Sequence, residues 1–539
     1  MRRTTSRCHP PAPCWGLCPE SWMNTSRRQA LGLLGLGLSA SWFAGCGARD
    51  PRPDPFTLGV ASGDPSADGC VIWTRLAPDP LAMDGLGGLR GPVEARWEVA
   101  LDPGLRQVVQ RGTVTALPQM AFSLPVTLRG LAPGRPYWYR FTALGHQSRI
   151  GRATTLPTPA STPQRLKLVA ASCSHYEKGF FSAYRHMADE QPDLALFLGD
   201  YIYESNVPPL LPAARRHGLP EARDLASYRR RYALYRTDPD LQYLHANVTS
   251  LLTWDDHEVQ NDYSGAWSAD PTVSPAAFAL RRQAAYQAFR EHAPLRGWRT
   301  QAAQTRLYDR WRFGDLAELH LLDGRQYRSA PACATSRTRG GHLVAPDCPG
   351  LRDAGRSMLG QAQEDWLMDG FRHNTTQWNL IAQDLLLAPL RQRLPDGDPA
   401  RWTDGWDGYP ATRERLLAAM ADSRLANPVT LGGDIHSFWV TDLHREPENE
   451  ASPVVASEFV GTSVTSDGPD YRRFQALLPE NPQVRFFDSR QRGYLALELT
   501  RERLRVDLRT ISDRTRPDAA RGTRASFVVE AGRPGAVPA

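Results

Sequence analysis

Lysine is almost absent from this chain of 539 residues, which carries it only at Lys167 and Lys178. Arginine supplies nearly all the positive charge, and the formal net charge of +6 is small for this length. The arginines are scattered among acidic residues and form no long basic run. A nucleic-acid-binding surface needs clustered basic residues, so the composition argues against a nucleic-acid partner.

Long hydrophobic runs are also lacking near the amino terminus. The Gly- and Leu-rich stretch 31–44 is too short to span a bilayer as a permanent helix, which needs ~20 apolar residues. It follows Arg27-Arg28, and a basic pair before a short apolar run is typical of a twin-arginine signal. Residues 1–46 are therefore expected to be a signal region that directs export by the Tat translocase to the periplasm or the medium. Phe43-Ala44-Gly45-Cys46 is similar to a lipoprotein cleavage box, but Phe is unusual at its first position, so lipid tethering through Cys46 stays open.

Cysteine is sparse, with eight residues in the whole chain. Cys333 and Cys348 flank a Gly- and Arg-rich loop, and outside the cytoplasm such a pair favours a disulfide. Cys70 lies in a strand-like pattern and is expected to pack in a core. Cys173 has two interpretations, because a free cysteine is either a small buried hydrophobe or, beside a cation, a thiolate ligand.

The character of the chain changes near residue 160. Residues 55–155 contain short alternating segments between turn residues, the pattern of a small antiparallel β-sandwich, and Leu128–Gly134 with Tyr137–Tyr139 resembles the late strands of fibronectin type III domains. After a proline-rich linker, a buried strand, a helix and a second strand predict an α/β domain over residues 165–539. The expected strands are 69–76, 95–100, 107–114, 123–128, 137–144 and 193–198, and the expected helices are 180–190, 225–234, 276–292 and 361–371.

Three buried apolar runs end in acidic residues. They are LFLGDYIYE (196–204), LLTWDDHEV (251–259) and VTLGGDIHSF (429–438), and the last two add a histidine. Each predicts a core strand that delivers its acid to the carboxyl end, the edge where open α/β sheets build their sites. Oxygen ligands and imidazoles from several strand ends predict a multinuclear metal site.

The residue types suit such a site. Asp200 can bridge two cations, and Tyr203, three residues later, can supply a phenolate, which favours a ferric ion. Asp255 and Asp256 would repel each other unless a cation or a hydrogen-bonded network offset their charge. Two residues apart on an extended strand, 434 and 436 would face the same way.

The motifs ASC, GDYIYE, WDDHEVQNDY and LGGDIHSF occur in this order and resemble those of the PhoD-like alkaline phosphatase family, within the calcineurin-like metallophosphoesterases. The resemblance runs from VASGDPSADGCVIWTRL (60–76) nearly to the carboxyl end. It implies an α/β metallophosphoesterase sandwich preceded by a small all-β domain. It also implies hydrolysis of small phosphoesters by metal-activated water, with one ferric ion and two calcium ions.

The resemblance also assigns roles to the site residues. In the wider superfamily the opening motif is D-x-H, whereas here it is Ser172-Cys173-Ser174-His175, and a cysteine fits an iron site better. By analogy, the iron ligands are Cys173, Asp200 and Tyr203, and His436 and Asp434 are further metal ligands. Asp255, Asp256 and Asn261 would contact calcium or phosphate. His257 would lie beside the phosphate and act as a catalytic group together with Asn261. Arg325, in LLDGRQYR, either clamps phosphate oxygens or belongs to an ordinary turn.

The sequence is also compatible with two other functions. The same metals would serve a phosphodiesterase similar to phospholipase D that acts on lipids or cell-wall polymers. A different class is a surface lipoprotein that binds a partner through its sandwich domain and has no catalytic activity.

Export should depend on the arginine pair. Replacing Arg27 and Arg28 together by lysine is expected to hold the protein in the cytoplasm, because the pair before the apolar run is the signal read by the translocase. Cell fractionation with immunoblotting measures the distribution. Normal periplasmic levels of the double variant would contradict the assignment of a twin-arginine signal.

Overall fold

Two β-sheets pack face to face in the computed structural model, which describes residues 53–297 and 306–539. In this part of the chain the larger sheet has ten strands, in the order β25 (Arg533–Pro538), β24 (Arg521–Glu530), β23 (Arg503–Ile511), β22 (Arg492–Thr500), β9 (Arg165–Ala171), β10 (Leu194–Leu198), β11 (Thr249–Thr253), β1 (Val60–Ser66), β2 (Gly69–Arg75) and β5 (Ser123–Thr127). The second sheet has seven, in the order β12 (Asp309–Phe313), β13 (Ala317–Leu321), β15 (Trp378–Ala382), β18 (Pro428–Gly432), β20 (Val454–Val460), β19 (Phe438–His444) and β21 (Val484–Asp488). Side chains from both sheets, such as Leu196, Leu319 and Phe459, share one hydrophobic core.

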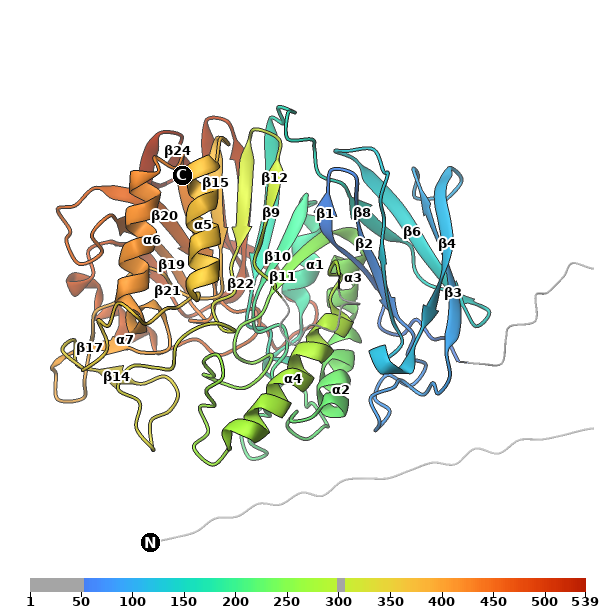
Figure 1. Cartoon of the computed structure of the whole chain (residues 1–539), viewed down its shortest axis with the longest axis horizontal. Helices are drawn as coiled ribbons and strands as arrows, with labels where there is room; N and C mark the ends of the chain where they lie inside the picture. The colour runs from blue at the N-terminus through green and yellow to red at the C-terminus, as the bar shows by residue number, and fades with distance from the viewer. Residues whose placement is uncertain (1–52, 298–305) are drawn as a thin grey trace, which may run out of the picture. The chain divides into compact units, whose positions relative to one another are not determined.

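Helices cover the outer faces of the two sheets. Figure 1 shows α5 (Gln361–His373) and α6 (Pro410–Asp422) on one side, and α2 (Leu225–Arg236), α3 (Pro239–Asn247) and α4 (Pro275–His292) on the other. The short helices are α1 (Ser182–Asp189), α7 (Tyr471–Gln475), η1 (Pro118–Met120), η2 (Tyr176–Lys178), η3 (Trp406–Gly408) and η4 (Leu478–Glu480). In a second hydrophobic core, helices α1, α2, α3 and α4 pack against the ten-stranded sheet. In a third, α5 and α6 pack against the seven-stranded sheet. The result is a layered α/β sandwich.

Local sequence explains where these helices begin. Asp224 and Ser227 form a capping box at the start of α2. Ser274 caps α4, with Pro275 at its first position, where a missing N–H costs nothing. The helices predicted from sequence are confirmed as α1, α2, α4 and α5, with ends that differ by no more than two residues.

The amino-terminal strands form two sheets around a core of their own. One is β4 (Val108–Ala116), β3 (Val93–Ala100), β6 (Pro136–Ala143) and β7 (His146–Gln147), with β8 (Gly151–Thr154) paired to β6. The other consists of β1, β2 and β5, and it continues the ten-stranded sheet, because β1 pairs with β11 in parallel. Cys70 is buried in this core, as predicted. This continuity, which the sequence pattern did not indicate, satisfies backbone groups of β11 that would otherwise form an open sheet edge.

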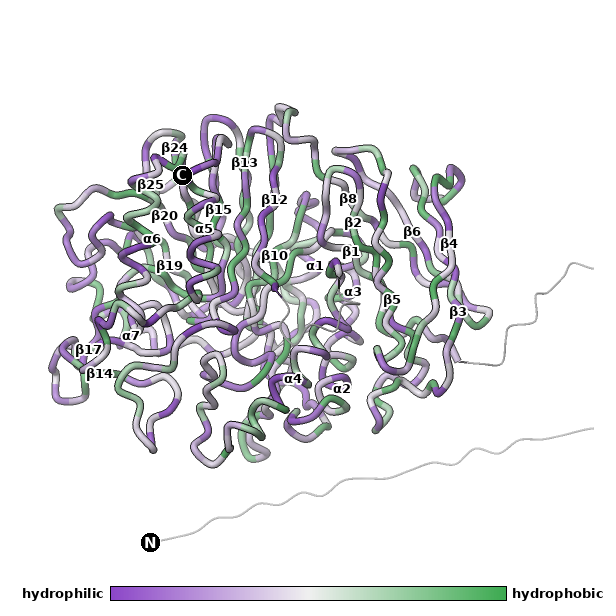
Figure 2. The backbone as a smooth tube through the Cα atoms, in the orientation of Figure 1, coloured by the Kyte–Doolittle hydropathy of each residue, from purple (hydrophilic) through white to green (hydrophobic). Residues whose placement is uncertain are grey.

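Each large sheet contains four consecutive parallel strands. In one they are β9, β10, β11 and β1, and in the other β13, β15, β18 and β20. Strands buried on both faces read as continuous apolar runs, and β10 is hydrophobic along its length in Figure 2. Among the described residues, no helix combines the length and apolar character needed to cross a membrane. A small sheet of β14 (Leu343–Val344), β17 (Pro399–Trp402) and β16 (Gln392–Arg393) lies in the loops that follow the seven-stranded sheet's strands.

Removing a side chain from the core between the sheets should destabilise the protein strongly. Leu196→Ala empties a fully buried position in β10 and is expected to cost about 2–5 kcal/mol of unfolding free energy. Differential scanning calorimetry measures the fall in melting temperature. The matched control is Leu280→Ala on α4, where the leucine is exposed and little change is expected. Equal melting temperatures for the two variants would contradict this assignment of the core.

Candidate metal centre

Polar residues follow the carboxyl ends of six strands that come from both sheets. They are Cys173 after β9, Asp200 after β10, Asp255 after β11, Arg325 after β13, Asp384 after β15 and Asp434 after β18. Hydrogen bonds join the ends, since Gly433 N donates to Asp384 O at 2.9 Å and Arg325 donates to Asp255. Parallel strands bring their carboxyl ends to one edge, so residues distant in sequence meet there.

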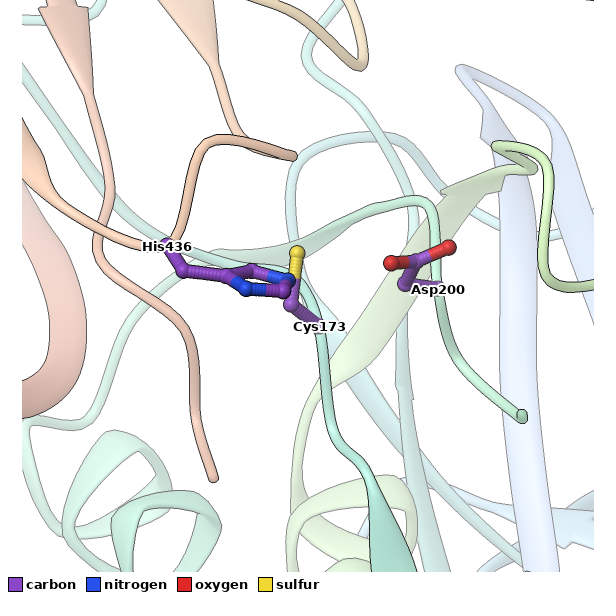
Figure 3. A group of neighbouring side chains, drawn as sticks. All are labelled: Cys173, Asp200 and His436. Atoms are coloured by element: carbon purple, nitrogen blue, oxygen red, sulfur yellow. The ribbon is translucent and has the colours of Figure 1, made fainter. Parts of the chain in front are cut away.

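The first cluster combines sulfur, nitrogen and oxygen donors (Figure 3). Single ligand atoms of Cys173, Asp200 and His436 all lie within 4.8 Å of one another. The Tyr203 hydroxyl donates to Asp200 Oδ2 at 2.8 Å and lies 3.2 Å from His436 Nε2. Burial and the neighbouring carboxylates raise the pKa of the Cys173 thiol and of the Tyr203 hydroxyl well above their ordinary values. A bound cation would offset that cost and favour the thiolate and phenolate forms.

Carboxylates dominate the adjoining clusters. Asp255, Asp256 and Asp434 form one group of ligand atoms within 4.8 Å, and Asp200, Asp256 and His257 form another. Burial, together with neighbouring acidic groups, raises the pKa of Asp200 and Asp434 well above the usual range. Two buried carboxylate oxygens, Asp255 Oδ2 and Asp256 Oδ1, have no hydrogen-bond partner. Orphaned oxygens among closely spaced carboxylates fit hard cations such as calcium.

Arg325 lies among these acids and is fully buried. Its Nε donates to Asp255 and one Nη donates to Asp404 Oδ1 at 2.9 Å. The other Nη lies 3.8 Å from Asp256 and 3.9 Å from Asp434, beyond hydrogen-bond distance. The guanidinium therefore offsets part of the buried negative charge, and only this second Nη is left without a hydrogen bond. Arg325 lies in the bend that follows β13, with its guanidinium turned into the acidic cluster, and its role as a phosphate clamp stays a prediction.

Glu258 ties two of the strand ends together, a role that the sequence analysis did not assign. Its carboxylate accepts hydrogen bonds from the backbone N–H groups of Asp200 at 3.1 Å, Tyr201 at 2.5 Å and Asp255 at 2.8 Å. It is buried, so it fixes the backbone from which the candidate ligands Asp200 and Asp255 project. Its position within the motif WDDHEV is the sequence feature that could have pointed to Glu258 as part of the site.

Glu204 orients His257 in a similar way. Its Oε2 accepts from His257 Nδ1 at 2.7 Å, and its Oε1 accepts from Asn261 N at 2.9 Å. Burial favours the neutral imidazole, but Glu204, Asp256 and Asp200 raise the pKa of His257 well above its ordinary value. Glu204 engages Nδ1, so Nε2 is the ring nitrogen that points elsewhere than Glu204.

Three further acids belong to this region. Asp384 is buried, and neither carboxylate oxygen has a hydrogen bond, although Oδ2 lies 3.7 Å from Arg325 Nε. The acid that ends a further apolar run, LIAQD, could have predicted it. Asp256, Asp262 and Asp404 form another group within 4.8 Å. Asp404 comes from an irregular loop that carries no sequence signal, and Arg328 pairs with it.

The backbone at the site is left-handed at several residues that are not glycine. The φ angles are 61° at Cys173, 53° at Asp200, 60° at Asp434 and 53° at His436. Such strain is uncommon outside glycine and tends to gather at functional sites. It also corrects one expectation, because β18 ends at Gly432 and residues 434 and 436 do not continue an extended strand. Gly199 precedes Asp200 with φ 87°, and a Cβ there would lie 2.4 Å from Asp255 Cβ.

A loop closed by a disulfide reaches the acidic region. Cys333 and Cys348 are joined, with their Cα atoms 6.4 Å apart. Between them, Gly341 N donates to Asp262 Oδ2 at 2.8 Å. The loop therefore helps to hold Asp262 in place.

Comparisons with known proteins agree with this arrangement. The family model for PhoD-like phosphatase matches residues 168–508, and the model for PhoD-like phosphatase, N-terminal domain, matches residues 40–157. Alkaline phosphatase D from Bacillus subtilis (strain 168) is 40% identical over 509 residues, which cover 92% of this chain and 85% of that protein. A solved structure described as "Structure of PhoD" matches with a TM-score of 0.84 and 40% identity, covering 90% of this chain and 92% of that one. The resemblance seen in the sequence motifs is thus confirmed, and the chain belongs to the PhoD-like phosphatase family and is a phosphoric ester hydrolase.

Proposed function

We propose that this hydrolase is an exported alkaline phosphatase and phosphodiesterase that uses one ferric ion and two calcium ions. The observation that carries this proposal is the meeting of Cys173, Asp200, Tyr203 and His436 beside a cluster of buried carboxylates. Thiolate, phenolate and imidazole suit iron, whereas carboxylates suit calcium. Iron would be held by these four residues, and calcium by Asp200, Asp255, Asp256 and Asp434.

The protein's own side chains have distinct tasks in hydrolysis. When bound, the cations supply positive charge that stabilises the phosphoryl transition state and acidify the attacking water. His257, held by Glu204 through Nδ1, presents Nε2 to a phosphoryl oxygen or to the leaving oxygen. Asn261 is exposed beside it and offers an amide donor to the substrate. Arg325 is already engaged with Asp255 and Asp404, so its contribution to substrate is limited to one Nη.

The same proposal covers the rest of the chain. Residues 1–46 direct export through the Tat translocase, and Cys46 offers a membrane tether. Residues 55–155 form the small β-sandwich domain, and residues 165–539 form the catalytic domain, whose substrates are small phosphoesters. The buried sandwich core and the separate core between the two large sheets support this division.

Metal analysis provides the first test. The purified enzyme should contain iron and calcium and show a visible charge-transfer band, because Tyr203 and Cys173 would bind iron as phenolate and thiolate. Tyr203→Phe should lose the phenolate contribution to the band while still folding.

EGTA should abolish hydrolysis of phosphomonoesters and phosphodiesters, and added calcium should restore it. A colourless, fully active enzyme, or full activity after exhaustive EGTA treatment, would contradict the proposed metals.

Asp200 should be the most damaging single position for turnover without being the most damaging for folding. As a bridging ligand it would hold two cations, so Asp200→Asn would weaken both and is expected to lower kcat by at least ~10³, about 4 kcal/mol. The cores do not involve its carboxylate, so calorimetry should still show a cooperative transition. The matched control is Asp189→Asn, which removes a carboxylate at the end of α1 and should leave kcat unchanged. An Asp200→Asn enzyme that keeps its metals and most of its turnover would refute the proposed site.

A further inference from the structure

Five consecutive apolar residues are exposed in the segment between β10 and α2. They are Pro208-Pro209-Leu210-Leu211-Pro212, here called the leucine tip. Leu210 is 98% exposed and Leu211 is 51% exposed. Single exposed apolar side chains are ordinary on soluble proteins. A continuous exposed run without a polar residue is a different feature, which marks an interaction site more often than chance.

The leucine tip is held rigidly in this exposed position. Leu211 N donates to Pro208 O at 3.0 Å and closes a turn. The Arg216 guanidinium donates to four carbonyl oxygens of the segment, those of Val207 at 3.1 Å, Pro208 at 3.4 Å, Pro209 at 3.3 Å and Leu211 at 2.6 Å. The three prolines also restrict the backbone. The leucines are therefore held in the solvent by a turn that hydrogen bonds and prolines stabilise. Their exposure does not result from a lack of local structure.

The base of the segment is fixed beside the metal centre. Glu177, in η2, accepts hydrogen bonds from the backbone N–H groups of Val207 and of His217, the latter at 2.9 Å. His175, next to η2, packs against Tyr203 with ring centroids 4.4 Å apart and the rings tilted by 36°. Leu210 is seven residues beyond Tyr203, a stretch that spans at most ~25 Å of extended chain. Whatever the leucine tip binds is therefore brought close to the site.

Charge identifies the kind of surface that fits. Residues 205–220 contain no acidic side chain and carry Arg215 and Arg216. Arg215 pairs with Asp238, whereas Arg216 has no carboxylate partner in the described part of the chain. An uncompensated positive charge thus lies directly beneath the apolar tip. Apolar side chains backed by a basic residue suit the boundary of an anionic phospholipid bilayer.

We propose that the leucine tip inserts into the surface of an anionic phospholipid bilayer and docks the enzyme there with its metal centre nearby. A second copy of the chain fits less well as the occupant. Five residues bury far less than the ~800 Å² per partner of a stable protein interface. Two copies meeting at the tip would also bring their unpaired Arg216 charges together. Docking is a binding property, so it is measured without turnover and separately from the proposed metals.

Vesicle co-sedimentation tests the proposal with the full chain. The vesicles contain equal parts of phosphatidylcholine and phosphatidylglycerol. The double variant Leu210→Asp, Leu211→Asp should partition at least ~10-fold more weakly than the wild type, because two apolar insertions are lost and two negative charges are added. The matched control is Val109→Asp, Val537→Asp, which adds the same charge at two other exposed apolar positions and should bind like the wild type. All three proteins share the same amino terminus, so any binding by that segment cancels in the comparison.

Three binding and light-scattering results would overturn the proposal. They are a wild type that does not bind the vesicles, a tip variant that binds as well as the wild type, and light scattering that shows a wild-type dimer separated by the tip substitutions. Hydrolysis of a small soluble phosphoester should be the same in the wild type and the tip variant, because neither leucine touches the metal centre. Its loss in the tip variant would mean that the substitutions disturbed the site, and the docking role would then fail.

Discussion

The site depends on positive charge that compensates buried carboxylates. These carboxylates lie where the strand ends of the two large sheets meet. Asp200, Asp255 and Asp434 cannot all ionise away from water unless positive charge lies among them. Arg325 supplies one such charge from inside the cluster, and orphaned carboxylate oxygens remain around it. The same acids would destabilise the fold without cations and would serve as ligands if cations bound, which would couple cation binding to the stability of the folded state.

The fold meets this demand by making the edge rigid. Glu258 accepts three backbone hydrogen bonds and so joins the ends of β10 and β11. Left-handed backbone at Cys173, Asp200 and Asp434 turns each side chain out of its strand direction. Such conformations persist only where the surrounding structure holds them, and here two large cores lie beneath them. The positions of these side chains are therefore set by the protein's own packing and hydrogen bonds.

Much of the fold was predictable because its elements are locally consistent. Continuous apolar runs marked β10, β11 and β18. The acids that follow those strands predicted Asp200, Asp255 and Asp434 at one edge, and the structure places them there. Glu204 and Glu258 lay inside the same motifs, but their role is to accept backbone and imidazole N–H groups, which no periodic pattern encodes.

The sequence by itself determined the strands, most of the candidate ligand residues and the family. Motif order and apolar periodicity can be read without knowing which residues are in contact. Only the tertiary structure decided that Arg325 lies among the acids, that Asp404 joins them from an irregular loop, and that β1 extends the large sheet. Those outcomes depend on contacts between residues far apart in the chain. Their energies come from burial and charge compensation, which exist only once the two sheets have packed.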